Sequence, residues 1–275
     1  MILRPRQREF VTRCVGALKT HGNTLGVAPT GAGKTICLSG TAGEFLAHPD
    51  AKACVLAHRD ELTAQNQSKF SRVNPGISTS VFDARQKSWA GQATFAMVQT
   101  LARNFDQLPT LDLLVIDEAH HIGARTWASF RGLFAERTPP IPVVQFTATP
   151  FREDGRRVDG EFIYTYPLKK AQQEGYFKPI RFEAVFGLDQ LDADQAIIDK
   201  LGDVLATDLD AGLNHLAMAR CSTIERAKHL HRLYTLAYPD YRPVIVHSQQ
   251  SLKERRENLT ALRRFDSRII VCVDM

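Results

Sequence analysis

A glycine-rich loop that ends in a lysine and a threonine is the feature of the sequence best suited to chemistry. Residues 28–35 read Ala-Pro-Thr-Gly-Ala-Gly-Lys-Thr, after the apolar residues 25–27 and before the helix-competent residues 36–46. A strand–loop–helix turn of this kind aims backbone N–H groups at a phosphate, and the helix N-terminus adds partial positive charge. The sequence therefore predicts a nucleotide-binding loop, formed by Thr30, Gly31, Ala32, Gly33, Lys34 and Thr35.

Two side chains of this loop have separate expected roles. Lys34 is expected to reach the β- and γ-phosphates of ATP, and the Thr35 hydroxyl is expected to ligate Mg²⁺. The general pattern begins with glycine, whereas this chain has Ala28 at that place. For the loop taken alone, a glycine-rich turn without a ligand is the alternative.

An acidic tetrad follows a second apolar run. Residues 111–116 are almost continuously apolar, which predicts a buried parallel strand, and Asp117, Glu118, Ala119 and His120 follow it. Ligands of parallel α/β sheets bind beyond the carboxyl ends of strands, so we expect Asp117 to hold Mg²⁺ directly or through water. Glu118 is expected to orient and deprotonate the attacking water, and His120 to sense the γ-phosphate. Such tetrads also cap exposed helices, but one that follows a phosphate loop predicts ATP hydrolysis.

Length and composition are those of a globular protein. The chain has 275 residues and a mass of 30.8 kDa, enough for two ordinary domains or one large domain. No apolar stretch is long enough to span a bilayer and the N-terminus has no apolar signal core, so we expect a cytoplasmic protein. A net charge of +5 and a pI of about 9.0 are compatible with a polyanionic partner.

The five cysteines give no sign of a zinc site or a disulfide framework. None forms a Cys-x-x-Cys pair, and most lie inside apolar runs, which predicts buried, reduced thiols. They are Cys14, Cys37, Cys54, Cys221 and Cys272.

Alternating strand and helix patterns predict a doubly wound parallel sheet over residues 1–167. An N-terminal helix has an apolar face, and a second helix is expected between a cap at Asp60 and a stop at residues 74–76. Besides the strands that precede the phosphate loop and the acidic tetrad, strands are expected at residues 53–57, 94–97 and 143–146.

The segment from 168 to 213 is expected to link this domain to a second one. One helix is expected between Asp192 and Leu209. The acidic side chains of the segment scatter over both sides of the run, so we interpret them as a solvated surface without metal-ligand spacing. They are Glu183, Asp189, Asp192, Asp194, Asp199, Asp203, Asp208 and Asp210.

Residues 214–275 predict the start of a second α/β domain. Strands at 216–219, 244–246 and 269–273 alternate with helices at 222–237 and 251–264. Because domains rarely end just after a buried central strand, we expect this domain to be truncated and the sequence to be a fragment.

Together these motifs resemble those of superfamily 2 helicases and translocases. The branch they resemble includes the motor subunits of type I and type III restriction enzymes and RadD-type DNA helicases. Residues 28–35 resemble motif I, where this branch commonly has alanine first, and residues 117–120 resemble motif II in its DEAH form. Residues 147–149, Thr-Ala-Thr followed by Pro-Phe-Arg, resemble motif III. The resemblance covers essentially the whole chain and implies two RecA-like domains.

The resemblance also implies a site for the adenine base. Residues 3–7, Leu-Arg-Pro-Arg-Gln, resemble the adenine-reading Q-type motif, which implies that Gln7 and Arg4 select adenine. The family often has an aromatic residue where this chain has Arg6.

Nucleic-acid contacts are implied by two further motifs and by the arginine that follows motif III. Residues 58–65 resemble motif Ia and residues 98–101 resemble motif Ib, which lie on the nucleic-acid face of the family. An arginine beside a helix N-terminus is also a ready phosphate site, although Asp60 and Glu61 capping the helix is the alternative. The implied contacts are Arg59, Gln99, Thr100 and Arg152, and Thr147 and Thr149 are implied to couple the state of ATP to the grip on the strand.

Residues in the second domain resemble later motifs of the family. Residues 217–223 resemble motif IV, and residues 247–265 resemble the stretch before motif V. Motif VI, which carries an arginine finger in the family, is expected beyond residue 275.

The sequence thus predicts a nucleic-acid-stimulated ATPase motor, a helicase or translocase that uses ATP and Mg²⁺. DNA is favoured over RNA as its partner, because the Thr-Ala-Thr-Pro-Phe-Arg form resembles the restriction and repair branch. One alternative is an ATP-dependent clamp or switch that binds nucleic acid without translocating. Another is a motor subunit that works with the partner subunits of a restriction or defence assembly. No membrane partner is expected.

Overall fold

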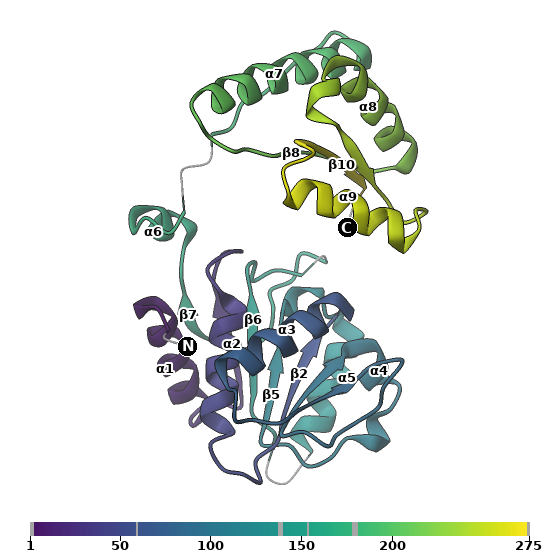
Figure 1. Cartoon of the computed structure of the whole chain (residues 1–275). Coiled ribbons are helices and arrows are strands. Elements are labelled where there is room, and N and C mark those ends of the chain that lie inside the picture. The colour runs from purple at the N-terminus through teal and green to yellow at the C-terminus, as the bar shows by residue number, and fades with distance from the viewer. Residues whose placement is uncertain (1–2, 59, 137–139, 153, 178–180, 274–275) are drawn as a thin grey trace. The chain divides into compact units, whose positions relative to one another are not determined.

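The computed structural model describes residues 3–58, 60–136, 140–152, 154–177 and 181–273. The chain divides into two compact units, Met1–Pro179 and Ile180–Met275 (Figure 1). Each unit has a parallel sheet covered by helices, which confirms the predicted doubly wound α/β fold class. The predicted linker, residues 168–213, contains a short helix of the first unit and a long helix of the second.

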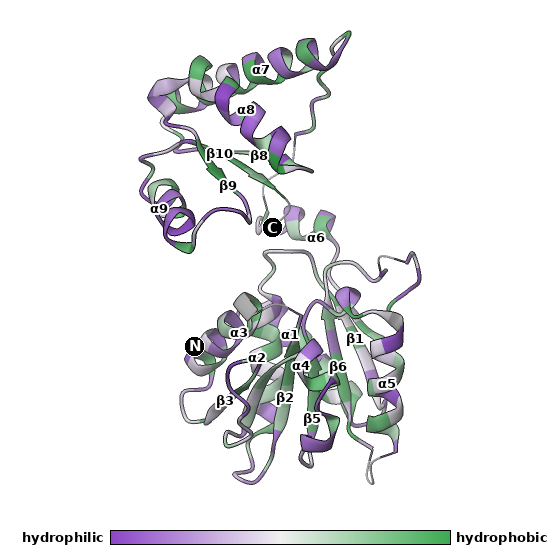
Figure 2. Ribbon diagram, turned by 90° about the vertical axis from the view of Figure 1, so that its right-hand side faces the viewer, coloured by the Kyte–Doolittle hydropathy of each residue, from purple (hydrophilic) through white to green (hydrophobic). Residues whose placement is uncertain are grey.

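Seven parallel strands form the sheet of the first unit, in the order β3-β4-β2-β5-β6-β1-β7. The inner strands are buried along almost their whole length, and Figure 2 shows them as the hydrophobic centre of the unit. Such strands are apolar on both sides because helices cover both faces of a parallel sheet. Their bounds are β1 Asn23–Val27, β2 Ala53–Ala57, β3 Thr79–Phe82, β4 Ala93–Met97, β5 Leu113–Ile116, β6 Val143–Thr147 and β7 Glu161–Thr165.

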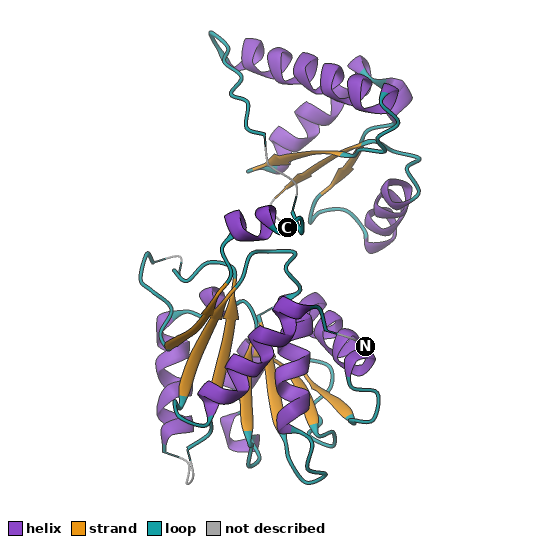
Figure 3. Ribbon diagram, turned by 90° about the vertical axis from the view of Figure 1, so that its left-hand side faces the viewer, coloured by secondary structure: helices purple, strands orange, loops and turns teal. Residues whose placement is uncertain are grey.

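Helices pack on the two faces of this sheet (Figure 3). One face is covered by α1 Pro5–Leu18, α2 Lys34–Phe45 and α3 Asp60–Val73, and the short α6 Leu168–Gln173 adds Ala171 to the same core. The other face is covered by α4 Val98–Ala102 and α5 Ala124–Ala135. Two short 3-10 turns, Phe105–Gln107 and Ala119–His121, follow α4 and β5.

The predicted strands of the first unit are all present, but strands β3 and β7 and helices α4 and α5 were not predicted. Strands β3 and β7 lie at the two edges of the sheet, where a half-exposed strand has no continuous apolar run. Helix α5 had a detectable signal, because Trp127, Phe130 and Phe134 repeat at helical spacing and are all buried.

The second unit has a three-stranded parallel sheet in the order β8-β10-β9. Helices α7 and α8 share a core on one face, and α9 packs on the other. Thr223 caps helix α8, with its hydroxyl accepting from the N–H of Arg226 at 3.1 Å. The bounds are α7 Gln190–Asp210, β8 Ala217–Cys221, α8 Ile224–Ala237, β9 Val244–Val246, α9 Leu252–Arg263 and β10 Ile269–Val273, with a 3-10 turn at Pro239–Tyr241.

The interpretation of the acidic segment as a solvated surface is wrong for Asp194. This side chain is only 1% exposed, and it accepts from both terminal nitrogens of the Arg226 guanidinium. The bond from Arg226 holds the pKa of Asp194 below its usual value. The carboxylate therefore ties α7 to α8 within the second unit, a role that charge spacing along one helix cannot reveal.

The cysteine prediction is confirmed. All five thiols are buried and unbridged, and burial raises the pKa of Cys37 to about 12. No helix within the described ranges is long and apolar enough to cross a membrane.

Candidate nucleotide and nucleic-acid site

The predicted motifs of the first unit meet at the carboxyl edge of its sheet. Strands β5, β6 and β1 are neighbours, and each ends at one of the three motifs that were expected to bind or sense the nucleotide. The N–H of Ala28 donates to the Thr147 carbonyl at 3.0 Å, which joins motif I to motif III directly. A parallel sheet brings these segments together because all its strands end on one side.

The phosphate loop has the backbone that its glycines predict. Gly31 and Gly33 have φ values of +88° and +87°, which residues other than glycine rarely adopt. Ala28 is outside this left-handed region and buried, so the first position of the loop does not require glycine. Helix α2 begins at Lys34, and its N-terminus therefore follows the loop without interruption.

Lys34 and Glu118 face each other across this edge. The Lys34 ammonium lies 3.4 Å from a Glu118 carboxylate oxygen, and the lysine side chain is nearly buried. Glu118 itself has φ of +48° and ψ of +52°, a strained left-handed conformation for a residue with a Cβ. This strained turn holds the Glu118 carboxylate beside the phosphate loop. Backbone strain of this kind is concentrated at functional sites.

Asp117 is buried, and its hydrogen-bond partners are neutral. Its carboxylate accepts from the Asn66 amide at 2.8 Å and from the Glu118 N–H at 3.0 Å. Burial raises the pKa of Asp117, and the neighbouring Glu118 carboxylate raises it further, while the Asn66 bond and the Lys34 charge act in the opposite direction. A buried carboxylate in this state favours a cation brought in with a ligand.

Asn66 was missed by the sequence analysis. It is a buried amide on α3, three residues after the buried Thr63, so two polar side chains lie on the inner face of an otherwise apolar contact. A polar pair at helical spacing between the apolar Leu62 and Phe70 was the available signal.

The oxygen donors at this edge fit Mg²⁺. Magnesium is usually held by one or two carboxylates together with phosphate oxygens and water, and a hydroxyl from the phosphate loop suits it as well. Asp117 and Thr35 are donors of these types. Among the described residues no group of three or more histidine, cysteine or acidic side chains could hold a metal ion.

The His120 ring lies between the Glu118 carboxylate and motif III. Its Nδ1 is 2.8 Å from the Thr147 hydroxyl and 3.6 Å from a Glu118 carboxylate oxygen. The Thr147 hydroxyl in turn donates to the Thr149 carbonyl at 2.7 Å and accepts from the Thr149 N–H at 3.2 Å. The four predicted residues Glu118, His120, Thr147 and Thr149 are therefore in sequential contact.

A stack of imidazole rings extends from His120 toward motif Ia. The rings of His120 and His121 are 4.0 Å apart between centroids, and those of His121 and His58 are 4.4 Å apart. The Gln99 amide lies 3.5 Å from the His58 carbonyl, which links motif Ib to the same end of the stack. The sequence analysis did not identify His58 or His121, because nothing in their spacing shows that the rings meet.

The Q-type motif lies against the phosphate loop. Gln7 accepts from the N–H of Arg4 at 3.0 Å, and its amide nitrogen is 3.4 Å from the Ala32 carbonyl. A Cβ on Gly33 would lie 2.4 Å from that nitrogen, so glycine is also required there by the close approach of Gln7. The predicted adenine-reading residue is thus in contact with the predicted phosphate loop.

The predicted nucleic-acid contacts differ in how far the structure describes them. Arg59 lies outside the described residues. The Gln99 side chain is exposed on α4, and Thr100 is half-buried beside it with its carbonyl accepting from Asn104. The guanidinium of Arg152 makes two bonds of 3.3 Å to Asp154, and its side chain is only 12% exposed.

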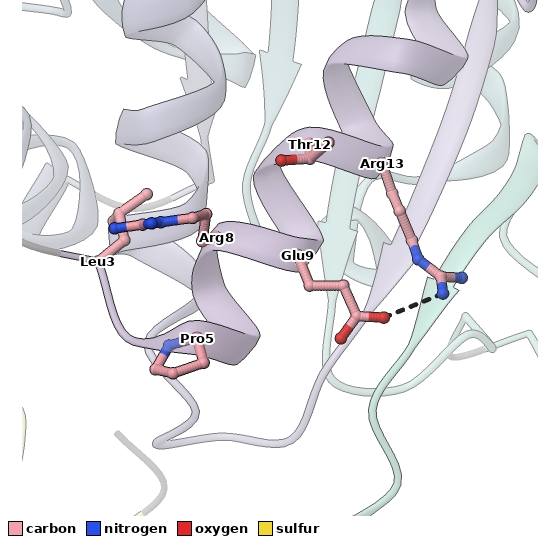
Figure 4. Close-up of a pocket in the computed structure, with 6 residues that line it drawn as sticks. All are labelled: Leu3, Pro5, Arg8, Glu9, Thr12 and Arg13. Carbon is pink, nitrogen blue, oxygen red and sulfur yellow. Dashed lines mark ion pairs between the residues drawn. The ribbon is translucent and has the colours of Figure 1, made fainter.

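A hollow along the outer surface of α1 is lined by Leu3 and Pro5 of the Q-type motif but by none of the predicted site residues. Figure 4 shows Leu3 and Arg8 on one side of it and the ion-paired Glu9 and Arg13 on the other. It lacks both the glycine-rich loop and the buried carboxylate, so we place the candidate site at the carboxyl edge of the sheet.

Comparison with known structures supports the fold over nearly the whole chain. The DNA-bound ATP-dependent type ISP restriction-modification enzyme LlaBIII is 16% identical, with a TM-score of 0.68 over 99% of this chain and 24% of that one. A fragment assigned to an HsdR subunit of a type I restriction enzyme from Vibrio vulnificus YJ016 is 21% identical, with a TM-score of 0.65 over 97% and 53%. Saccharomyces cerevisiae Dbp5 bound to RNA and ADP BeF3 is 14% identical, with a TM-score of 0.60 over 98% and 74%. At these identities the likeness shows the RecA-like fold alone.

Sequence comparison identifies the family. The ATP-dependent helicase candidate IRC3 of Saccharomyces cerevisiae is 29% identical over 170 residues, which cover 56% of this chain and 24% of IRC3. The chain therefore spans about a quarter of the length of this curated relative. Residues 1–152, more than half of the chain and all of the motifs at the carboxyl edge, match the family described as "Type III restriction enzyme, res subunit". The chain belongs to this family of superfamily 2 helicase-type proteins.

Proposed function

We propose that the protein is an ATP-dependent nucleic-acid motor, a helicase or translocase that hydrolyses ATP with Mg²⁺ at the carboxyl edge of its first sheet. The observation that carries the proposal is the 3.4 Å contact between Lys34 and Glu118, with Asp117 buried next to it. A phosphate-binding cation and a candidate general base that share one edge are what phosphoryl transfer to water requires. Family membership, and the description of the yeast relative as an ATP-dependent helicase, support the same proposal.

In this proposal each side chain has one task. Lys34 leaves Glu118 and binds the β- and γ-phosphates, so that the Glu118 carboxylate becomes available to orient the attacking water and to accept its proton. Thr35 and Asp117 would hold Mg²⁺, which would supply positive charge against the negative charge on the phosphates. Backbone N–H groups of residues 30–33 bind the remaining phosphate oxygens.

His120 carries the state of the γ-phosphate to motif III. Its Nδ1 lies 3.6 Å from a Glu118 carboxylate oxygen and 2.8 Å from the Thr147 hydroxyl. A movement of the Glu118 carboxylate therefore changes the contact between His120 and Thr147. Thr147 and Thr149 then alter the segment that leads to Arg152. Nucleic acid binds in this proposal along Arg59, Gln99, Thr100 and Arg152, and Arg152 must exchange Asp154 for a phosphate.

We further propose DNA as the preferred nucleic acid. The motif III form and the family both favour the restriction branch, and the DNA-bound LlaBIII structure shares the fold. Because Dbp5, which shares the fold as well, was solved with RNA, the choice needs a direct test. A motor subunit within a restriction or defence assembly is a second candidate, favoured by the family itself.

The test compares ATPase rates of the protein alone, with single-stranded DNA, with duplex DNA and with RNA. We expect stimulation that is largest with DNA, and loss of both nucleotide binding and turnover in Lys34→Ala. Lys19→Ala, which removes an exposed lysine at the end of α1, is the matched control. Turnover of Lys34→Ala at the wild-type rate would reject the site. Displacement of a triplex-forming strand separates a motor from a clamp.

A further inference from the structure

The segment that follows α6 is folded back toward the phosphate loop. Gly175 has φ of +76°, a left-handed value that ends the helix and that glycine adopts without strain. The N–H groups of Tyr176 and Phe177 both donate to the Ala171 carbonyl, at 2.9 and 3.3 Å. Two consecutive aromatic residues are therefore presented from a fixed turn.

Arg6 anchors this segment to α1. Its Nε lies 3.1 Å from both carboxylate oxygens of Glu174, a further bond comes from a terminal nitrogen, and the Tyr166 hydroxyl donates to Glu174 at 2.9 Å. The Arg6 bond holds the pKa of Glu174 below its usual value. Arg6 stands where related motifs often have an aromatic residue, and here its guanidinium is engaged in anchoring.

The two aromatic side chains have different surroundings. Phe177 is half-buried over the phosphate loop, where a Cβ on Gly31 would lie 3.0 Å from its ring. Tyr176 is 41% exposed, and the Arg4 guanidinium carbon lies 5.6 Å from its ring centroid. Because Arg4 is also bonded to Gln7, a continuous line of contacts leads from the Tyr176 ring to the loop.

From this arrangement we infer that Tyr176 provides the face on which the adenine of ATP stacks. The inference rests on the proposed function. It assigns the stacking role to a residue about 170 positions after the Q-type motif in the sequence. An exposed cation–π contact is weak, so the base can displace Arg4 from the Tyr176 ring or lie between the two. The Gln7 amide keeps donor and acceptor capacity for the edge of the base.

The experiment measures the affinity of the protein for ATP and for inorganic tripolyphosphate by calorimetry. Loss of one stacking face should weaken ATP binding about tenfold in Tyr176→Ala, while tripolyphosphate affinity changes by less than about twofold. Tyr176→Phe keeps the ring and should bind ATP within about twofold of wild type. Leu168→Ala, which shortens an exposed apolar side chain on the adjacent α6, is the control.

The possible outcomes separate this inference from the proposed function. If Tyr176→Ala binds ATP as well as wild type while Lys34→Ala does not bind it, the stacking role is wrong and the nucleotide site stands. If Tyr176→Ala loses tripolyphosphate in the same proportion as ATP, the ring only supports the loop and the inference is wrong. If the wild type binds neither probe, the proposed function fails and this inference fails with it.

Discussion

The two units each bury an aspartate, and the two are held in opposite ways. The Arg226 guanidinium donates two hydrogen bonds to Asp194 of the second unit, and these lower the pKa of the Asp194 carboxyl. Within the described residues, Asp117 of the first unit accepts from an amide and a backbone N–H, and burial raises its pKa. Lys34 contacts Glu118 in the acidic tetrad. One carboxylate is neutralised within the protein and the other is left for a ligand.

This contrast gives a physical criterion for a site that burial alone does not. A buried carboxylate with its own arginine fork contributes to packing, and removing the arginine exposes the cost of the buried charge. A buried carboxylate without a bonded cation carries that cost in the free protein and recovers it when Mg²⁺ and phosphate bind. Perturbed groups of the second kind are the ones to expect at functional sites.

The largest effect is expected at the proposed catalytic edge of the first unit. Glu118→Gln keeps the shape of the side chain but removes the base, so ATP hydrolysis should fall about 10² to 10⁴-fold while nucleotide affinity is retained. Single-turnover hydrolysis and equilibrium binding measure the two properties separately. Glu136→Gln, at the exposed end of α5, is the matched control. Normal hydrolysis by Glu118→Gln would mean that another group positions the water.

In the second unit the corresponding change should affect stability. Arg226→Met leaves Asp194 buried without its guanidinium partner and should destabilise the unit by about 3 kcal/mol. Both tryptophans, Trp89 and Trp127, lie in the first unit, so hydrogen exchange of α8 and β10 is the appropriate measurement. Arg232→Met changes an exposed arginine of the same helix and should have little effect.

The same pair also fixes the sign of a pH dependence. The folded pKa of Asp194 is below the ordinary value of 3.8, so its contribution is fully present above that value and is lost as pH falls through the folded pKa. Without Arg226, burial raises the pKa of Asp194 in the variant, so the stability difference between wild type and Arg226→Met should be largest near neutral pH and shrink as pH falls from the variant's Asp194 pKa toward that of the wild type. A difference that does not shrink in acid would contradict the assignment of the effect to the Asp194 charge.

A smaller effect, of opposite sign, is expected for Asp117→Asn. Replacing a buried charge that has neutral partners should stabilise the ligand-free first unit by about 1 to 2 kcal/mol, as often seen at strained functional positions. Urea unfolding followed by tryptophan fluorescence measures it, with the exposed Asp106→Asn as control. Addition of Mg²⁺ and ATP should then stabilise the wild type more than the variant. A destabilised, ligand-free Asp117→Asn would show that the two aspartates are alike.

Most of the fold could be predicted because central strands and their helices carry strong local patterns. Residues 28–35 and 117–120 specify both their chemistry and their position, since each follows a buried apolar strand. The edge strands β3 and β7 have no such run, and their existence depends on pairing with β4 and β1. A local pattern cannot show a pairing that is decided by sheet order.

Contacts between distant side chains were beyond the sequence for the same reason. Asn66 reaches Asp117 over 51 positions, Arg226 reaches Asp194 over 32, and Arg6 reaches Glu174 over 168. The local sequence around each residue does not indicate its partner, because the pair forms only in the tertiary fold. These contacts decide which carboxylates are neutralised, so the sequence identified the candidate site but not its supporting residues.

The imidazole stack is another such contact, and it gives the smallest expected effect. His121 is exposed, and its ring lies between those of His120 and His58, so it spans the distance from the acidic tetrad to motif Ia.

If the stack transmits the state of the site, His121→Leu should leave basal ATPase within about twofold and lower its stimulation by DNA about fivefold, a coupling energy of about 1 kcal/mol. His121→Phe retains a flat ring and should keep most of the stimulation, whereas the exposed His48→Leu, away from the stack, should change nothing. The nucleotide-dependent change in DNA affinity should also be smaller in His121→Leu, and this binding coupling can be measured without hydrolysis by using ADP and a non-hydrolysable analogue. Equal stimulation and equal linkage in wild type and His121→Leu would confine communication to His120 and Thr147, and the stack would then only pack the edge of the sheet.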